Sequence, residues 1–170
     1  IAVRLQPDYF PAQFSIGVLL QAEGRHREAI ERFAAAIKAR PTYVEARLRL
    51  ASSLRRTGRV KEALAEYAQC MTDAPDNSEA RMGYAMTLAR LGRYREARDT
   101  LSAAASQSGS DIVFTHGLAR LLATAPDAGV RDGQRAMTLV QQMLQRGRTL
   151  ELGETYAMTL AELGQFREAQ

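Results

Sequence analysis

The sequence holds few of the side chains that perform acid–base, nucleophilic or metal chemistry. Its two histidines, His26 and His116, lie 90 residues apart, and Cys70 is its only cysteine. A catalytic site needs a nucleophile or an acid–base pair in a pocket closed to water, and a zinc site needs several cysteine or histidine ligands. Neither pattern occurs, and no glycine-rich phosphate-binding loop is present. We therefore expect no catalytic residue, no metal site and no cofactor in this chain.

The composition is that of a folded protein with an arginine bias. Hydrophobic residues make up 46% of the 170 residues and charged residues 25%, and no apolar run reaches the 18 residues of a membrane span. The net charge of +4 comes from 21 arginines and two lysines scattered along the chain, without the aromatic side chains that stack on nucleic-acid bases. This pattern indicates the coding bias of a GC-rich bacterial genome. We expect no nucleic-acid or membrane partner, and the compartment stays open between cytoplasm and periplasm.

Three series of residues recur every 34 positions, which indicates an internal repeat. Within each period, apolar residues follow helical spacing in two blocks, separated by a glycine and closed by a proline. Each period therefore predicts a helix, a tight turn, a second helix and a loop. Small residues such as Gly17, Ala29 and Ala36 are expected where the two helices approach closely. The three series are Gly24, Gly58 and Gly92; Ala29, Ala63 and Ala97; and Pro7, Pro41 and Pro75, continued by Gly109.

The repeats are not all of one length. Two related segments, YAMTLARLGRYREA from Tyr84 and YAMTLAELGQFREA from Tyr156, lie 72 residues apart, which is four more than two periods. The extra residues follow Leu122, where Pro126 replaces the turn glycine, and the loop up to Asp132 is expected to be irregular. Both ends fall inside a repeat, so we expect an excerpt of a longer array whose exposed ends favour end-to-end pairing of chains. The predicted units are the tail of a preceding repeat at 1–9, regular repeats at 10–43, 44–77 and 78–111, a lengthened repeat at 112–149 and a partial repeat at 150–170.

This frame resembles the tetratricopeptide repeat, which places large, small and aromatic residues at fixed positions over one period. The resemblance implies an all-α fold, a right-handed superhelical solenoid of antiparallel helix pairs that forms a single domain over residues 1–170. It also implies that the first helix of each repeat lines a concave binding face, and that Cys70 takes a small, buried structural place. The first unit matches the family pattern at Ile16, Gly17, Leu20, Gly24, Ala29, Phe33, Ala36 and Pro41, with His26 in an aromatic place.

By the same resemblance, ligand-facing residues occupy the second, fifth, ninth, twelfth and thirteenth places of each repeat. They are apolar in the middle of the expected groove and include arginines along one side, although Phe14, Leu48 or Met82 could instead pack against an adjacent helix. A row of exposed apolar residues marks an interaction site, and methionine adapts to varied partners. The expected ligand is a protein segment or peptide with apolar anchors and some acidic residues. The predicted peptide-binding groove consists of Phe14, Val18, Gln21, Leu48, Ser52, Arg55, Met82, Met86, Arg90, His116, Arg120, Glu154 and Met158.

The resemblance also narrows the partners and the function. Domains of this family that hold the carboxylate of heat-shock chaperones have Lys, Asn and Asn where this chain has Phe14, Val18 and Arg49, so no chaperone carboxylate clamp is expected. The sequence favours a non-catalytic protein–protein interaction scaffold that binds a partner segment in its concave groove. The alternative is a substrate-positioning or regulatory arm of a larger enzyme whose catalytic domain lies outside this chain.

Overall fold

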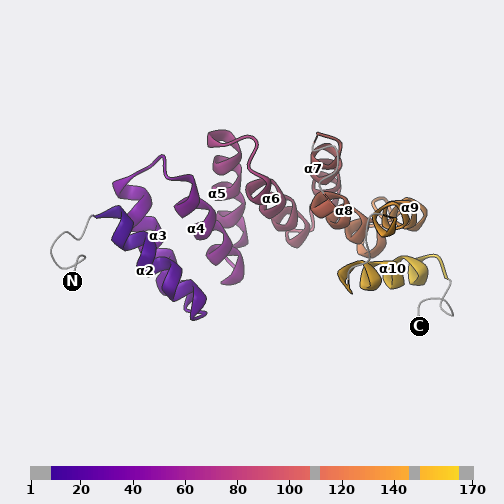
Figure 1. Ribbon diagram of the computed structural model, residues 1–170, viewed down its shortest axis with the longest axis horizontal. Helices are drawn as coiled ribbons and strands as arrows, with labels where there is room; N and C mark the ends of the chain where they lie inside the picture. Colours follow the sequence, from indigo (N-terminus) through magenta and orange to yellow (C-terminus); the bar gives the residue numbers. More distant parts are fainter. Residues whose placement is uncertain (1–8, 108–111, 146–149, 165–170) are drawn as a thin grey trace. The chain divides into compact units, whose positions relative to one another are not determined.

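The computed structural model describes residues 9–107, 112–145 and 150–164, and every regular element in these residues is an α-helix (Figure 1). The prediction of an all-α fold built from helix pairs is confirmed. None of the described helices combines the length and the apolar character that crossing a membrane would need. The helices are α2 (Phe10–Ala22), α3 (His26–Ala39), α4 (Val44–Arg56), α5 (Val60–Asp73), α6 (Ser78–Arg90), α7 (Tyr94–Gln107), α8 (Ile112–Thr124), α9 (Gly133–Leu144) and α10 (Leu150–Glu162).

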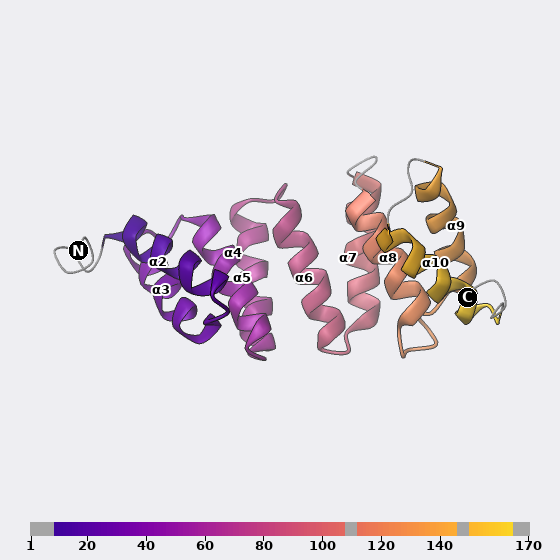
Figure 2. The same cartoon turned by 60° about the horizontal axis from the view of Figure 1, so that its bottom comes forward.

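The chain forms two compact units, which we call unit 1 (Ile1–Leu91) and unit 2 (Gly92–Gln170). In unit 1 each helix from α2 to α6 packs against the next, and α4 also contacts α2 and α6 (Figure 2). In unit 2 the helices α7 to α10 pack in the same sequential way, and α8 also contacts α10. Within each unit, the first helices of successive repeats therefore touch one another.

The tight turns between paired helices depend on glycine. Gly24, Gly58 and Gly92 have φ angles of 76°, 84° and 77°, in the left-handed region where a side chain is costly. These glycines follow α2, α4 and α6, where the period of 34 placed the turns. The conformation explains why glycine recurs at this place of the frame.

An ion pair marks the start of each regular second helix. The guanidinium groups of Arg25, Arg59 and Arg93 each bind the glutamate three residues later, at 2.6 Å in all three pairs. These contacts, which we call the turn ion pairs, hold the pKa of the three glutamate carboxyls below its usual range. All six side chains are about half exposed, so each pair adds little to the free energy of unfolding. The turn ion pairs complete the N-terminal turns of α3, α5 and α7. The glutamates are Glu28, Glu62 and Glu96.

The core of each repeat forms where a small residue meets a large ring. A Cβ atom added to Gly17 would lie 2.6 Å from Cε1 of Phe33, so only glycine lets α2 approach α3 this closely. Ala29 and Ala36 are fully buried on α3, as the frame predicted. Gly83 has the same relation to the ring of Tyr67, which lies on α5. One glycine–aromatic pair therefore joins the two helices of the first repeat, and the other joins the second repeat to the third.

Cys70 is buried in the core that α4 and α5 share with α6. Its exposed fraction is 0%, and it packs with Leu48, Ala51, Tyr67 and Ala80. Burial raises the pKa of the thiol to about 12, so the nucleophilic thiolate is scarce at neutral pH. The structural interpretation of this cysteine is confirmed.

The lengthened repeat replaces the glycine turn with a longer segment between α8 and α9. Residues 125–132 form no helix, yet Ala125 and Val130 are buried. The backbone amide of Asp132 donates to the carbonyl of Leu122 at 3.0 Å, and the carboxylate of Asp132 caps α9 by accepting from the amide of Arg135 at 2.9 Å. The loop is irregular, as expected, but it is anchored at its start and its end. The predicted tail repeat at 1–9, apart from Tyr9, and residues 165–170 of the partial repeat lie outside the described residues.

Candidate functional site

The predicted groove residues are divided between the two units. Those on α2, α4 and α6 belong to unit 1, and those on α8 and α10 belong to unit 2. Because α4 contacts both α2 and α6, the residues in unit 1 come from helices that touch one another. We call this set the first-helix surface of unit 1. It consists of Phe14, Val18, Gln21, Ser52, Arg55, Met82, Met86 and Arg90.

Leu48 is the predicted groove residue that the structure removes from the surface. Its exposed fraction is 1%, and it packs against Tyr67 of α5 and Ala80 of α6 in the core. A side chain with no exposed surface cannot contact a ligand, so the prediction that Leu48 lines the groove is wrong. The fifth place of the second repeat points into the helix packing, because α6 closes over it.

The apolar part of the first-helix surface is uneven in exposure. Phe14 is half-buried, with its ring centroid 5.0 Å from that of Tyr43 and 6.0 Å from that of Phe33. Val18 and Met82 are half-buried as well, whereas Met86 is 40% exposed. Met86 therefore offers the largest free apolar surface, and Phe14 chiefly serves the packing of α2 on α3.

A hydrogen-bond chain joins α2 to α4 on this surface. The side-chain amide of Gln21 donates to the hydroxyl of Ser53 at 3.1 Å and to the carbonyl of Arg49 at 3.4 Å. The guanidinium of Arg49 donates back to Gln21 at 3.4 Å and pairs with Glu45 at 2.9 Å. Gln21 thus has a structural role, and Ser53 and Glu45 were not among the predicted residues. Ser53 is fully buried, which no helical periodicity indicated.

The arginines of the first-helix surface are not neutralised within the described residues. Arg55 and Arg90 of this surface, and Arg56 beside them in sequence, lie in the last turns of α4 and α6, and none of the three has a carboxylate partner in the described ranges. The Nε atom of Arg55 is buried and has no hydrogen-bond acceptor among these residues. Cations favour the C-terminal end of a helix, where the backbone carbonyls are negative. This end of the surface can therefore attract an anionic group while it stabilises its own helices.

The predicted residues in unit 2 form a different arrangement. The Nε2 atom of His116 lies 2.7 Å from the hydroxyl of Thr155, and this contact joins α8 to α10. Arg120, Glu154 and Met158 are exposed. Opposite charges on Arg120 and Glu154 make this part of the chain less selective for an acidic ligand than the first-helix surface of unit 1.

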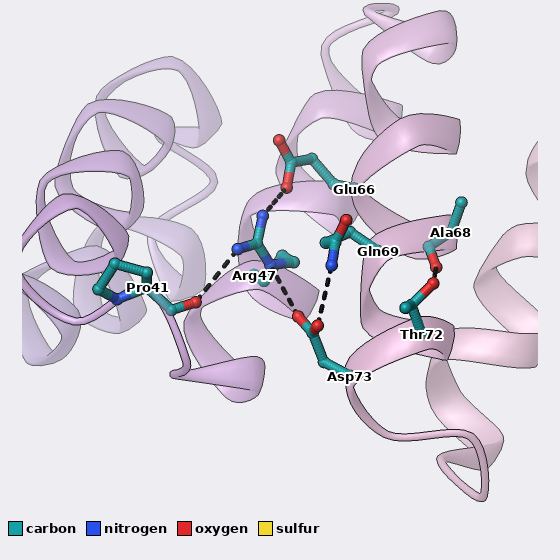
Figure 3. A network of polar contacts seen from close by, with 7 residues as sticks. All are labelled: Pro41, Arg47, Glu66, Ala68, Gln69, Thr72 and Asp73. Atoms are coloured by element: carbon teal, nitrogen blue, oxygen red, sulfur yellow. Dashed lines mark hydrogen bonds and ion pairs between the residues drawn. The ribbon is translucent and has the colours of Figure 1, made fainter.

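A polar network on α4 and α5 was missed by the sequence reasoning (Figure 3). Arg47, whose side chain is 16% exposed, pairs with Glu66 at 2.9 Å and lies 3.7 Å from Asp73. It also donates to the carbonyl of Pro41 at 3.1 Å, and Gln69 donates to Asp73 at 2.8 Å. Arg47 therefore ties the loop before α4 to α5. One signal was available, because Arg81 stands 34 residues later and donates in the same way to the carbonyl of Pro75.

The described residues hold no cluster of carboxylate, histidine or cysteine side chains that could bind a metal ion. His26 and His116 lie on different units, on α3 and α8. Cys70 is buried, and burial raises the pKa of its thiol. The arrangement can offer apolar contact, hydrogen bonds and positive charge, which are means of binding.

Comparisons with known proteins agree with the fold. A family profile described as tetratricopeptide repeat matches residues 20–69 and 54–121. A search of curated protein sequences gave no significant match.

Similar solved structures come from bacterial proteins. A tetratricopeptide repeat protein from Parabacteroides merdae has a TM-score of 0.79 and 15% identity over 94% of this chain, and the chain spans 62% of its length. A thermophilic repeat protein from Thermus thermophilus has a TM-score of 0.75 and 21% identity, covering 94% of this chain and 86% of that one. YrrB, described as having an unusual peptide-binding site, has a TM-score of 0.70 and 14% identity, covering 99% of this chain and 84% of that one. At these identities the likeness concerns the fold.

Proposed function

Because the chain belongs to the tetratricopeptide repeat family, we propose that it is a non-catalytic scaffold that binds a segment of a partner protein on the first-helix surface of unit 1. Proteins of this family generally serve protein interaction, and the solved relative YrrB has a peptide-binding site. The observation that carries the proposal is the combination of exposed Met86 with three arginines that lack carboxylate partners among the described residues. A ligand that covers Met86 and pairs with these guanidinium groups would lower the free energy of the complex.

The ligand that fits this surface has two kinds of side chain. Apolar anchors would cover Val18, Met82 and Met86, and the flexible thioethers would adapt to their shape. Acidic side chains would lie at the ends of α4 and α6, where the guanidinium groups of Arg55 and Arg90 can form charge-assisted hydrogen bonds.

A pull-down from extract of the source organism tests the proposal. We would compare the natural chain with Met82→Glu/Met86→Glu, which places two negative charges on the surface. The matched control is Leu19→Glu/Leu163→Glu, because both of these leucines are exposed and lie outside the first-helix surface. Circular dichroism would confirm that each variant is folded.

We expect the methionine variant to lose the partner protein and the leucine control to retain it. Partners that the control retains and the methionine variant loses would place recognition on the first-helix surface of unit 1. If both variants capture the same proteins as the natural chain, or if the control loses them equally, the proposal is wrong.

A further inference from the structure

Unit 2 contains a cavity that none of the predicted groove residues line. Its volume is about 270 Å³, and it lies between α7, α8 and α9. Apolar side chains contribute much of its wall, namely those of Ala105, Ile112, Leu118, Leu139 and Met143. A space of this size suits one side chain of a partner rather than a cofactor.

The polar residues that line the cavity include hydroxyl and amide side chains and one arginine. Thr115 and Gln142 line the cavity from α8 and α9, and Ser102 lines it from α7. Among the residues that the structure describes, Arg135 is the only charged residue that lines the cavity, no aspartate or glutamate lines it, and no acceptor pairs with the guanidinium of Arg135. The charge balance therefore favours a negative group beside the apolar wall.

The equivalent helix pair of unit 1, α4 and α5, carries an ion pair where the cavity of unit 2 has uncharged side chains. Counted from the starts of their helices, Thr115 on α8 corresponds to Arg47 on α4, and Leu139 on α9 corresponds to Glu66 on α5. In unit 1 a hollow of about 430 Å³ is lined by Arg47 and Asp73, whose charges face each other at 3.7 Å. In the second repeat, the charge of Arg47 is therefore balanced by the carboxylate of Glu66 (Figure 3). In the lengthened repeat the arginine and its glutamate are both replaced.

A further charge is reversed between the two repeats. Arg135 on α9 stands where α5 has Glu62, the acidic member of a turn ion pair. At the start of α9 the helix is instead capped by Asp132, which accepts from the backbone amide of Arg135. Within residues 112–145, the described part of the lengthened repeat, Arg135 therefore has no ion-pair partner.

We propose that this cavity is a second binding site, which takes a partner segment with an apolar side chain followed by an acidic residue. The apolar side chain packs against Ile112 and Leu139, whose side chains are partly exposed, and removes their apolar surface from water. The carboxylate that follows it pairs with Arg135 at the exposed edge. This site is independent of the first-helix surface of unit 1, because all its residues belong to unit 2.

A titration of the full chain with a minimal probe tests this site by amide nuclear magnetic resonance. The probe is acetyl-leucyl-aspartyl amide, which has one apolar side chain and one carboxylate. We expect saturable shifts at the amides of Ser102, Thr115 and Gln142. Acetyl-leucyl-asparaginyl amide lacks only the charge, and should bind about two- to fivefold more weakly, as expected for an exposed ion pair. Acetyl-alanyl-aspartyl amide lacks the apolar bulk and should give no saturable shifts.

Variants separate this site from general surface attraction. Arg135→Gln should bring the aspartyl probe to the affinity of the asparaginyl probe, whereas Arg95→Gln, at an arginine of α7 that is 71% exposed and outside the cavity, should not change it. Thr115→Arg/Leu139→Glu installs the ion pair of unit 1 and should abolish binding while the chain stays folded. Absence of saturable shifts, equal affinity of both leucyl probes, or unchanged binding by the filled variant would each overturn the proposal.

Discussion

Replacing Gly17 by alanine should destabilise the chain, although alanine is the better helix former. A Cβ at Gly17 would lie 2.6 Å and 2.8 Å from Cε1 and Cδ1 of Phe33, and this ring is fully buried and cannot move aside freely. Overpacking of this kind costs about 1–3 kcal/mol, while the change from glycine to alanine inside a helix gains about 0.5–1 kcal/mol. We expect the free energy of unfolding to fall by about 1–2 kcal/mol as the balance of the two.

The matched control is Gly153→Ala in α10. An added Cβ there has no atom within 4 Å, so only the gain in helix propensity applies. Urea unfolding followed by circular dichroism should show opposite signs for the two variants. In the background of Phe33→Leu, which shortens the ring side chain, Gly17→Ala should lose most of its cost. The reasoning is refuted if Gly17→Ala stabilises the chain as Gly153→Ala does, because α2 and α3 would then not be in close contact.

Three further predictions concern other parts of the chain. Cys70 should resist iodoacetamide at pH 8 in the folded protein and react once urea unfolds it, because burial raises its thiol pKa to about 12; rapid alkylation of the folded chain would contradict the burial. The turn ion pairs depress the pKa of their glutamates in the folded state, so their stabilisation is present above the usual glutamate pKa of about 4.3 and is lost as the pH falls through and below that value. Replacing all three glutamates by glutamine should slightly flatten the acid dependence of the melting temperature, and an unchanged profile would show that the pairs do not stabilise the fold. Ala97→Leu should lower the free energy of unfolding by about 1–3 kcal/mol, because the alanine is fully buried, and an unchanged midpoint in urea would count against the repeat frame.

The repeat period predicted the helices because certain positions of the repeat need one residue type for a local structural reason. Gly24, Gly58 and Gly92 meet the need for a left-handed turn, so their spacing alone locates the helix ends. The frame position of Gly17 predicted a close approach of two helices, and the structure shows that Phe33 is the residue it meets there. These features depend on residues near one another in the sequence or on a single helix pair.

The candidate site was harder to predict because it depends on what neighbouring repeats cover. Leu48 and Met86 occupy groove places of adjacent repeats, yet the first is 1% exposed and the second 40%. Periodicity cannot tell them apart, since the difference arises from how α6 lies on α4 and α5. The network of Arg47 was missed for another reason. A charged residue at a helical position is usually solvated, and its burial became visible only with Glu66 and Pro41 beside it.

Site-specific photocrosslinking tests the central proposal most directly. A benzoylphenylalanine at Met86, on the first-helix surface of unit 1, would be compared in cells of the source organism with the same group at Leu19, which is 64% exposed outside that surface. The account predicts an adduct with a defined partner protein from Met86 and none from Leu19, with the crosslinked partner peptide containing apolar and acidic residues. Adducts from Leu19 alone, or the same adducts from both positions, would contradict it.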